Sequence, residues 1–221
     1  MRNHTLIVFA KTPVSGLTKT RLIPRIGAEG AVNLYRAMVM CTLENSMQSG
    51  IEAVQLWCAP TIDHPFFQAC AQHYNVTLHR QEGADLGERM AHAITVTLHH
   101  SRHVILIGTD CPSLTGVTLK HAGMLLDQGI NTVIAPATDG GYVLLGVTRP
   151  SPELFAAISW GSDTVMQSTR ERLRNLGARW YEFAEHRDID RPEDLDYLFS
   201  QNLLPDLPDI ADTTALLPPS A

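Results

Sequence analysis

The stretch that decides the fold is TLIVFAKTPVSGLTKTRLIPRIG, Thr5–Gly27. Its first six residues, Thr5–Ala10, are almost wholly apolar and predict a buried β-strand. Pro13 and Gly16 then break the strand into a loop, and a helical pattern begins at Ala28. Open α/β sheets bind ligands beyond the carboxyl ends of their strands, so we expect this loop to lie at a ligand-binding edge.

Three cations lie in this loop, namely Lys11, Lys19 and Arg21. Backbone N–H groups freed by Gly16, together with cationic side chains, form an anion-binding cradle, and arginine adds a fork of donors that matches phosphate. We therefore predict that Lys11, Gly16, Lys19 and Arg21 bind the phosphates of a nucleotide. The chain contains neither GxxxxGK(S/T) nor GxGxxG, so this is not a Walker or dinucleotide loop. The alternative is a solvated basic turn.

The composition is that of a globular protein rather than a nucleic-acid-binding or membrane protein. Of 221 residues, 44% are hydrophobic and 18% charged, and the net charge of −6 argues against a nucleic-acid partner. No apolar run is long enough to span a membrane, and Thr5–Ala10 is too short for a signal peptide. The four cysteines show no CxxC spacing, as expected in a reducing compartment. We therefore expect a cytoplasmic protein.

Strand and helix patterns alternate along the chain, which favours an α/β fold with a mostly parallel sheet and helices on both faces. Asp-Gly and Gly-Gly signals between two apolar runs add a β-hairpin excursion. The predicted strands are Thr5–Ala10, Ala53–Cys58, Val76–Arg80, His103–Ile107, Thr132–Ala135, Tyr142–Val147 and Trp180–Phe183. The predicted helices are Ala28–Gln48, Pro65–His73, Leu86–His99, Leu119–Gln128, Pro152–Ala157, Thr164–Leu176 and Pro192–Phe199.

This pattern predicts one domain over residues 1–202. Residues 203–221 form a tail rich in Leu and Pro, without a clear pattern. The tail is expected to pack loosely, to be disordered, or to lie on a neighbouring subunit. Oligomeric state, including a homo-oligomer, is left open by the sequence.

A second group of candidate residues is IGTDCPSL, Ile107–Leu114. Asp110 comes directly after an apolar strand, at the same predicted edge as the cationic loop. A carboxylate there can hold Mg²⁺ or Mn²⁺ against a bound phosphate. The alternative is that Asp110 caps the helix that starts near Thr115 or forms a hydrogen bond within the turn. Cys111 has no neighbours that would activate a thiolate, so we interpret it as a small buried residue.

A third group is HRDIDRPEDLDYL, His186–Leu198. Asp188 and Asp190 alternate, so in an extended segment they share one face. Asp190 is the candidate second metal ligand, although Asp188 could take that place. The alternative for Asp190 is a capping box with Glu193, with Pro192 in the first turn of a helix.

Two further loops carry candidate nucleotide-binding residues. Asp85 lies in the glycine-containing acidic loop QEGADLGERM, which could wrap a base or ribose or could simply start a helix. Asp139 lies in the turn of ATDGGYVLLG, where an acceptor could approach the backbone closely, or which could be a plain hairpin. The histidines His99, His100 and His103 lack the spacing of a metal site, and we interpret them as surface residues.

Five blocks of the chain, in this order, resemble a family of uncharacterised bacterial GT-A-like transferases. That family is described as glycosyltransferase-like and as associated with radical-SAM or selenium-domain genes. It resembles a branch of the nucleotide-diphospho-sugar transferase superfamily and is similar to guanylyltransferases of cofactor biosynthesis. The blocks are FAKTPVSGLTKTRL, QEGADLGERM, IGTDCPSL, ATDGGYVLLG and DIDRPEDL.

The resemblance implies a single GT-A (Rossmann-like) domain, a bound nucleotide and a divalent metal, Mg²⁺ or Mn²⁺. Lys11, Lys19 and Arg21 correspond to the triphosphate loop of the relatives, and Asp110 and Asp190 to their metal carboxylates. A glycosyltransferase DxD motif is absent at Asp110, because Cys and Pro follow it.

The function expected is therefore that of a metal-dependent, nucleotide-using transferase. The leading hypothesis is nucleotidyl transfer from an NTP to a phosphorylated small-molecule acceptor, with Lys19, Arg21 and Asp110 as catalytic residues. The first alternative is glycosyl transfer from a nucleotide-diphospho-sugar. The second is a non-catalytic nucleotide-binding module.

Overall fold

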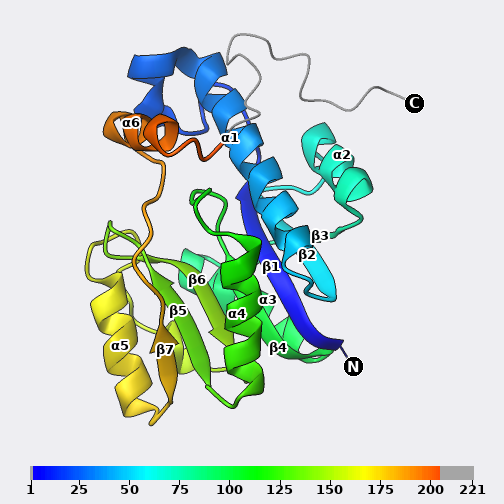
Figure 1. The fold of residues 1–221 in the computed structure, drawn as a ribbon, viewed down its shortest axis with the longest axis vertical. Coiled ribbons are helices and arrows are strands. Elements are labelled where there is room, and N and C mark those ends of the chain that lie inside the picture. Colours follow the sequence, from blue (N-terminus) through cyan, green and yellow to red (C-terminus); the bar gives the residue numbers. More distant parts are fainter. Residues whose placement is uncertain (1, 205–221) are drawn as a thin grey trace.

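The computed structural model describes residues 2–204. Its centre is a seven-stranded sheet with the strand order β3-β2-β1-β4-β6-β5-β7 (Figure 1). Only β6 runs against its neighbours, since it pairs antiparallel with both β4 and β5. The strands are β1 (Arg2–Lys11), β2 (Ala53–Ala59), β3 (Thr77–Arg80), β4 (Ser101–Ile107), β5 (Thr132–Pro136), β6 (Tyr142–Val147) and β7 (Trp180–Glu182).

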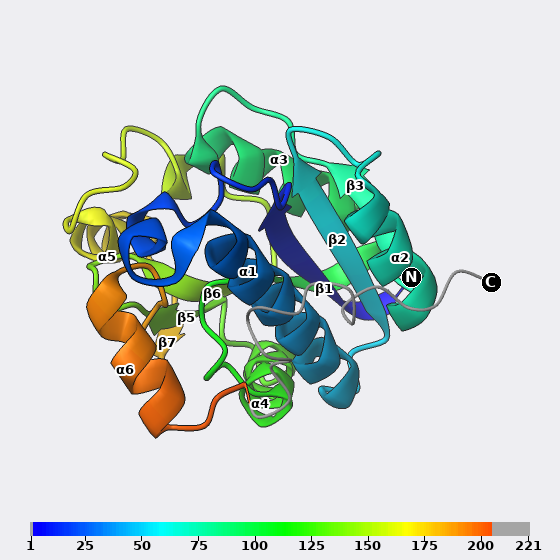
Figure 2. The same ribbon diagram turned by 90° about the horizontal axis from the view of Figure 1, so that it is seen from above.

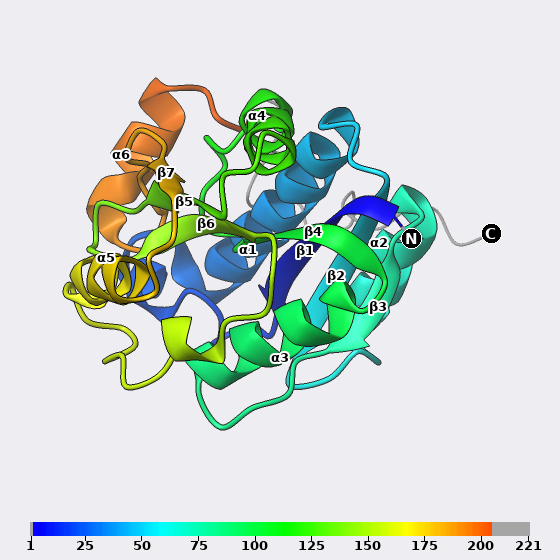
Figure 3. The ribbon, with the colours of Figure 1, turned by 90° about the horizontal axis from the view of Figure 1, so that it is seen from below.

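Helices cover both faces of this sheet, as Figure 3 shows from below. The long helices are α1 (Ile23–Gln48), α2 (Pro65–Tyr74), α3 (Leu86–Leu98), α4 (Gly116–Asp127), α5 (Val165–Asn175) and α6 (Pro192–Ser200), with short 3₁₀ turns at Thr20–Leu22 and Pro152–Leu154. The predicted α/β class, with a mostly parallel sheet, helices on both faces and a hairpin excursion, is confirmed.

The core divides into two layers because successive side chains of a strand point to opposite faces. Leu6, Val8 and Ala10 of β1 pack with α1, α2, α4 and α6, whereas Ile7 and Phe9 pack with α3 and α5. The central strand β4 is apolar on both faces, as its continuous run of hydrophobic residues predicts.

The main difference from the predicted elements lies at the start of α1. The predicted helix begins at Ala28, but α1 begins at Ile23 and is interrupted at Gly27, whose φ of 72° and ψ of 169° are not helical. The pattern therefore found the second helical segment and missed the short first one. That first segment belongs to the loop that follows β1.

The boundary predicted at residue 202 stays a prediction, because residues 205–221 of the tail lie outside the described residues. Between residues 2 and 204, no helix combines the length and the apolar character needed to cross a membrane.

Candidate active site

A large cleft of about 1470 Å³ opens at the carboxyl ends of the central strands, the edge seen from above in Figure 2. This volume is ample for a nucleotide and a small acceptor. The charged residues that line the cleft are of both signs: Lys11, Lys19, Arg21, Arg80, Arg89, Glu82, Asp110, Asp188 and Asp190.

The ammonium group of Lys19 lies at the centre of the acidic part of the cleft. Its side chain is only 5% exposed, and Nζ lies 3.0 Å from Oδ1 of Asp110 and 3.5 Å from Oδ1 of Asp190. The same ammonium donates a 2.6 Å hydrogen bond to the carbonyl oxygen of Ile189. Two carboxylates eighty residues apart therefore meet at one cation, and their oxygens can be no farther apart than the sum of the two distances.

Asp110 does not cap the helix that follows it. The N-cap of α4 is Thr115, whose hydroxyl accepts a hydrogen bond from the N–H of Thr118. The Asp110 carboxylate is instead 47% exposed and faces the cleft. The capping alternative is therefore wrong for Asp110, and its carboxylate is available to bind a ligand.

The capping box predicted from Asp190 and Glu193 is also wrong. The carboxylate that accepts the backbone N–H groups at the start of α6 belongs to Asp194, which binds the N–H of Asp190 at 3.0 Å and of Arg191 at 2.7 Å. The helix begins one residue later than an Asp190 N-cap requires, so Arg191 is the N-cap and the N3 carboxylate is that of Asp194 rather than Glu193. Asp190 is left to pair with Arg21 and Lys19.

Asp188 is a further carboxylate of this cluster. Ile189, between Asp188 and Asp190, is fully buried, and its N–H donates a 2.8 Å hydrogen bond to the carbonyl oxygen of Asp110. The two flanking aspartates both line the cleft, as their alternation predicts. The structure therefore brings Asp110, Asp188 and Asp190 together.

The carboxylate of Asp188 is the least compensated of the three. The pKa of Asp188 is raised to about 7, mainly by burial and then by the neighbouring charges of Asp110, Asp139 and Asp190, while Lys19 opposes them. Within residues 2–204, no group donates a hydrogen bond to this carboxylate. Two cations, Lys19 and Arg21, thus face the carboxylates of Asp110, Asp188 and Asp190, which leaves an excess of negative charge where a divalent cation fits.

The cationic loop reaches the cleft from the other side. Gly16 has a positive φ of 77°, which accounts for glycine at this turn. Lys11 and Arg21 are exposed and line the cleft, and the N–H of Lys11 donates to the hydroxyl of the buried Tyr35. The predicted contact of Lys11, Lys19 and Arg21 with phosphates stays a prediction, and Lys19 already faces carboxylates.

The carboxylates of Asp85 and Asp139 accept hydrogen bonds from backbone N–H groups nearby in the sequence. The Asp85 carboxylate caps α3 by accepting the N–H of Glu88 at 2.8 Å, and Asp85 is not among the residues that line the cleft. The Asp139 carboxylate accepts the N–H of Gly141 in the β5–β6 turn, close enough to Asp188 to affect its pKa. Neither residue is among those that line the cleft, and their predicted contact with a nucleotide stays a prediction.

Sequence reasoning missed two cations of the cleft, Arg80 and Arg89. Arg80 is the last residue of β3, so the rule that ligands bind at strand carboxyl ends could have identified it. The Arg89 guanidinium donates to the carbonyl oxygen of Gly83 and so holds the loop after β3. Cys111 is buried, and burial raises the pKa of its thiol to about 12, in keeping with a structural role.

A family model described as an uncharacterized protein conserved in bacteria (DUF2064) matches residues 42–162, more than half of the chain. None of the curated proteins compared with the chain matches it.

Solved structures share the fold over almost the whole chain. A protein from Desulfovibrio desulfuricans G20, provisionally named a nucleotide-diphospho-sugar transferase, is 29% identical, with a TM-score of 0.84 over 91% of this chain and 88% of that one. A cytidylyltransferase from Leptospira borgpetersenii is 16% identical, with a TM-score of 0.56 over 90% of this chain and 86% of that one.

Glucosyl-3-phosphoglycerate synthase from Mycobacterium tuberculosis, in a complex with Mn²⁺, UDP and glucosyl-3-phosphoglycerate, is 13% identical. Its TM-score is 0.56 over 96% of this chain and 82% of that one. Together these findings confirm the resemblance to the nucleotide-diphospho-sugar transferase superfamily that the sequence blocks predict.

Proposed function

The chain belongs to the bacterial DUF2064 family and has the fold of nucleotide-using transferases, and on this basis we propose that it is a metal-dependent nucleotidyltransferase. In the proposed reaction, a phosphate oxygen of a small acceptor attacks the α-phosphorus of an NTP, and pyrophosphate leaves. This chemistry depends on alignment and on charge stabilisation rather than on a covalent intermediate with the protein.

The observation that carries the proposal is the uncompensated carboxylate of Asp188 beside Asp110. Partly buried carboxylates that lack hydrogen-bond donors are costly unless a cation neutralises them. Oxygen ligands of this type suit Mg²⁺ and Mn²⁺. Asp110 and Asp188 would hold the ion, with Asp190 as a further candidate. When bound, the ion would neutralise charge on the phosphate oxygens of the nucleotide.

The protein's own cations would orient the phosphates. Lys11, Arg21 and Arg80 line the cleft with exposed side chains, so they can bind phosphate oxygens without a loss of core packing. Lys19 would act differently. Because its ammonium is buried between Asp110 and Asp190, it would hold these carboxylates in place and limit their repulsion.

Glycosyl transfer is the second candidate, and one finding favours it. The relative with 29% identity bears the name of a nucleotide-diphospho-sugar transferase, and a nucleotide sugar presents the same diphosphate to the metal and cations. The two reactions differ in the bond that breaks. Nucleotidyl transfer releases pyrophosphate, whereas transfer of the sugar releases a nucleoside diphosphate.

Product analysis therefore tests the proposal. The protein is incubated with Mg²⁺ or Mn²⁺, each of the four NTPs and a panel of phosphorylated sugars and polyols, and pyrophosphate is measured. Parallel reactions contain nucleotide sugars, and nucleoside diphosphate is measured. Pyrophosphate release that depends on metal and acceptor supports nucleotidyl transfer, while nucleoside diphosphate release supports glycosyl transfer.

Two variants make this test specific to the cleft. Asp188→Asn should abolish product formation, because it removes the charge and keeps the shape of the side chain. Asp196→Asn is the matched control, since the Asp196 carboxylate is exposed on α6, outside the cleft lining, and pairs with Arg25. Metal-dependent nucleotide binding without either product would instead indicate a non-catalytic module.

A further inference from the structure

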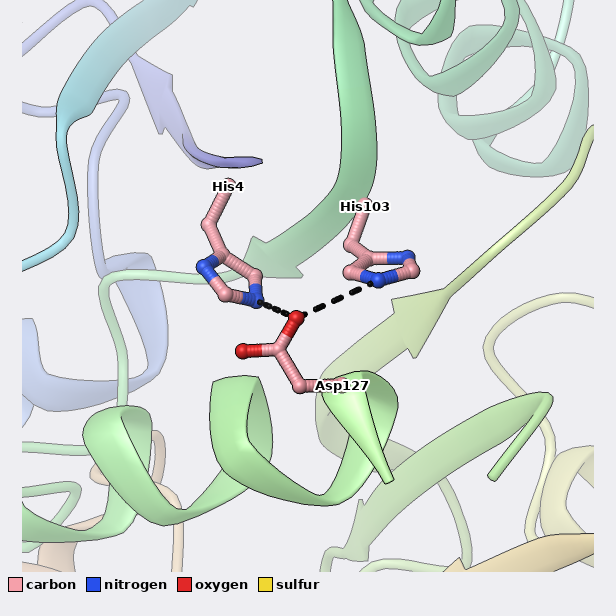
Figure 4. A group of neighbouring side chains, drawn as sticks. All are labelled: His4, His103 and Asp127. Atoms are coloured by element: carbon pink, nitrogen blue, oxygen red, sulfur yellow. Dashed lines mark ion pairs between the residues drawn. The ribbon is translucent and has the colours of Figure 1, made fainter. Parts of the chain in front are cut away.

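A second group of metal-ligand side chains lies far from the cleft, at the amino-terminal ends of β1 and β4. His4 of β1 and His103 of β4 are direct register partners in the parallel sheet, so their side chains leave the same face. Asp127, the last residue of α4, points toward both rings (Figure 4). The three residues come from three different elements, and only the fold brings them together.

The distances suit one shared ion. Nε2 of His4 lies 3.3 Å and Nε2 of His103 lies 3.4 Å from the same oxygen, Oδ1 of Asp127. The ligand atoms of the three residues all lie within 4.8 Å of one another. In a tetrahedral zinc site with bonds of about 2.0–2.1 Å, neighbouring ligand atoms are about 3.3–3.4 Å apart.

The histidine nitrogens also lack other partners. Among the described residues, Nε2 of His4 and both ring nitrogens of His103 are buried without a hydrogen bond. The contacts to Asp127 are thus close in distance but are not aligned as N–H···O bonds. A simple polar cluster would align at least one such bond, since a buried unsatisfied nitrogen is costly.

The side chain of His103 is buried at this site. Its side chain is only 6% exposed, so the prediction that it is a surface residue is wrong. The buried ring lies beside the Asp127 carboxylate, with both of its nitrogens free of hydrogen bonds among the described residues.

A fourth ligand can approach the group from solvent. Gly123 lies one helical turn before Asp127, and a Cβ atom at this position would lie 3.5 Å from Nε2 of His4. The Asp127 side chain is 41% exposed, so one side of the group faces solvent. Three protein ligands with an open fourth position are the arrangement of zinc sites that keep a bound water.

We propose that His4, His103 and Asp127 form a binding site for a divalent transition-metal ion of the zinc class. The site joins the beginnings of β1 and β4 to the end of α4, on the opposite edge of the sheet from the cleft. It requires two imidazoles and one carboxylate, whereas no histidine is among the residues that line the cleft. The proposal is therefore independent of the reaction that the cleft performs.

The test uses the full-length, tag-free protein, stripped of metal with a chelator. Because the cleft carboxylates can also bind Zn²⁺, all measurements are made in an Asp110→Asn, Asp188→Asn background. Calorimetry with Zn²⁺ should show one equivalent bound. Co²⁺ should give the visible absorption of a low-symmetry site with nitrogen and oxygen ligands and no thiolate charge-transfer band.

Substitution of the ligands should remove this binding. Asp127→Asn and His103→Gln should each weaken Zn²⁺ binding by more than about 100-fold, since even loss of an outer partner costs about 10–100-fold. Asp127→Asn keeps the test valid if His103→Gln fails to fold, because Asp127 is partly exposed. His121→Gln, which changes an exposed ring elsewhere on α4, should bind Zn²⁺ like the background protein.

Three results would overturn the proposal. They are an absence of stoichiometric Zn²⁺ binding by the background protein, equal affinity of the Asp127→Asn variant, and a cobalt spectrum with a thiolate band.

Discussion

The backbone N–H of Ile189 donates a 2.8 Å hydrogen bond to the carbonyl oxygen of Asp110. This bond joins the loop after the central strand β4 to the segment that enters α6. Since Ile189 is fully buried, the segment is anchored on one face and presents Asp188 and Asp190 on the other. The positions of Asp188 and Asp190 beside Asp110 thus depend on a main-chain hydrogen bond between residues far apart in the chain.

The first prediction concerns Asp188. Its carboxylate is partly buried among other carboxylates, so Asp188→Asn should raise the free energy of unfolding of the metal-free protein at pH 8 by about 1–3 kcal/mol. The same variant should lose the stabilisation that Mg²⁺ and nucleotide give to the parent protein. Thermal and urea unfolding with and without ligands measure both effects. A destabilised metal-free variant would contradict this view of Asp188.

The second prediction compares Lys19 with Arg21. Lys19→Met keeps most of the side-chain volume but removes a buried ammonium with three partners, so it should lower the free energy of unfolding by about 1–3 kcal/mol. Arg21→Ala removes a side chain that is 66% exposed and should change stability by less than about 0.5 kcal/mol.

Arg21→Ala should nevertheless weaken nucleotide binding by about 1–3 kcal/mol, because the guanidinium lines the cleft, is 66% exposed, and has donors besides the one that binds Asp190. Calorimetry with NTPs measures this loss. Equal nucleotide affinity of the variant and the parent would exclude Arg21 from the phosphate site.

The third prediction separates capping from ligand binding at α6. Asp194→Ala removes the acceptor of two backbone N–H groups and should lower the free energy of unfolding by about 1–2 kcal/mol. Asp190→Asn should change stability much less, because Asp190 does not cap the helix. Chemical denaturation of both variants gives the comparison, and a larger loss for Asp190→Asn would reverse the assignment of the cap.

The fourth prediction concerns pH. Arg170 binds the Glu182 carboxylate through two nitrogens, and this contact holds the pKa of Glu182 below its ordinary value of 4.5. The stabilisation should be fully present above pH 4.5 and should be lost as the pH falls through the lower pKa of the folded state.

Glu182→Gln should therefore cost about 1 kcal/mol at pH 7 and less at pH 3, a modest value because both side chains are partly exposed. Unfolding experiments at the two pH values check this difference. A cost that is independent of pH would contradict the role of the ionised carboxylate.

Local signals were sufficient for much of the fold. The apolar run of β4 predicts a central strand, and the turn at Asp139 predicts the β5–β6 hairpin, because both depend on neighbours in sequence. The position of Asp110 at the end of β4 follows from the same reasoning. The sequence pattern places the start of the helix at Ala28. The reason is that Gly27, whose φ and ψ are not helical, separates the short first segment of α1 from the rest of the helix.

Features that depend on tertiary contacts could not be predicted in this way. The sequence predicts a capping box of Asp190 with Glu193, and only the exact start of α6 moves it to Arg191 and Asp194. His4 and His103 are 99 residues apart, and their contact requires the register of β1 with β4. Lys19 was expected at phosphates, but its burial against Ile189 turns the ammonium toward Asp110.

The central claim, that carboxylates at the carboxyl edge of the sheet hold a metal ion beside a nucleotide, can be tested by anomalous X-ray diffraction. Crystals grown with Mn²⁺ and an NTP that stabilises the protein would be measured near the manganese absorption edge. We predict an anomalous peak at about 2.0–2.6 Å from carboxylate oxygens of Asp110 and Asp188, next to the nucleotide phosphates. A bound nucleotide without a manganese peak at these carboxylates, or with the peak held by other residues, would contradict the claim.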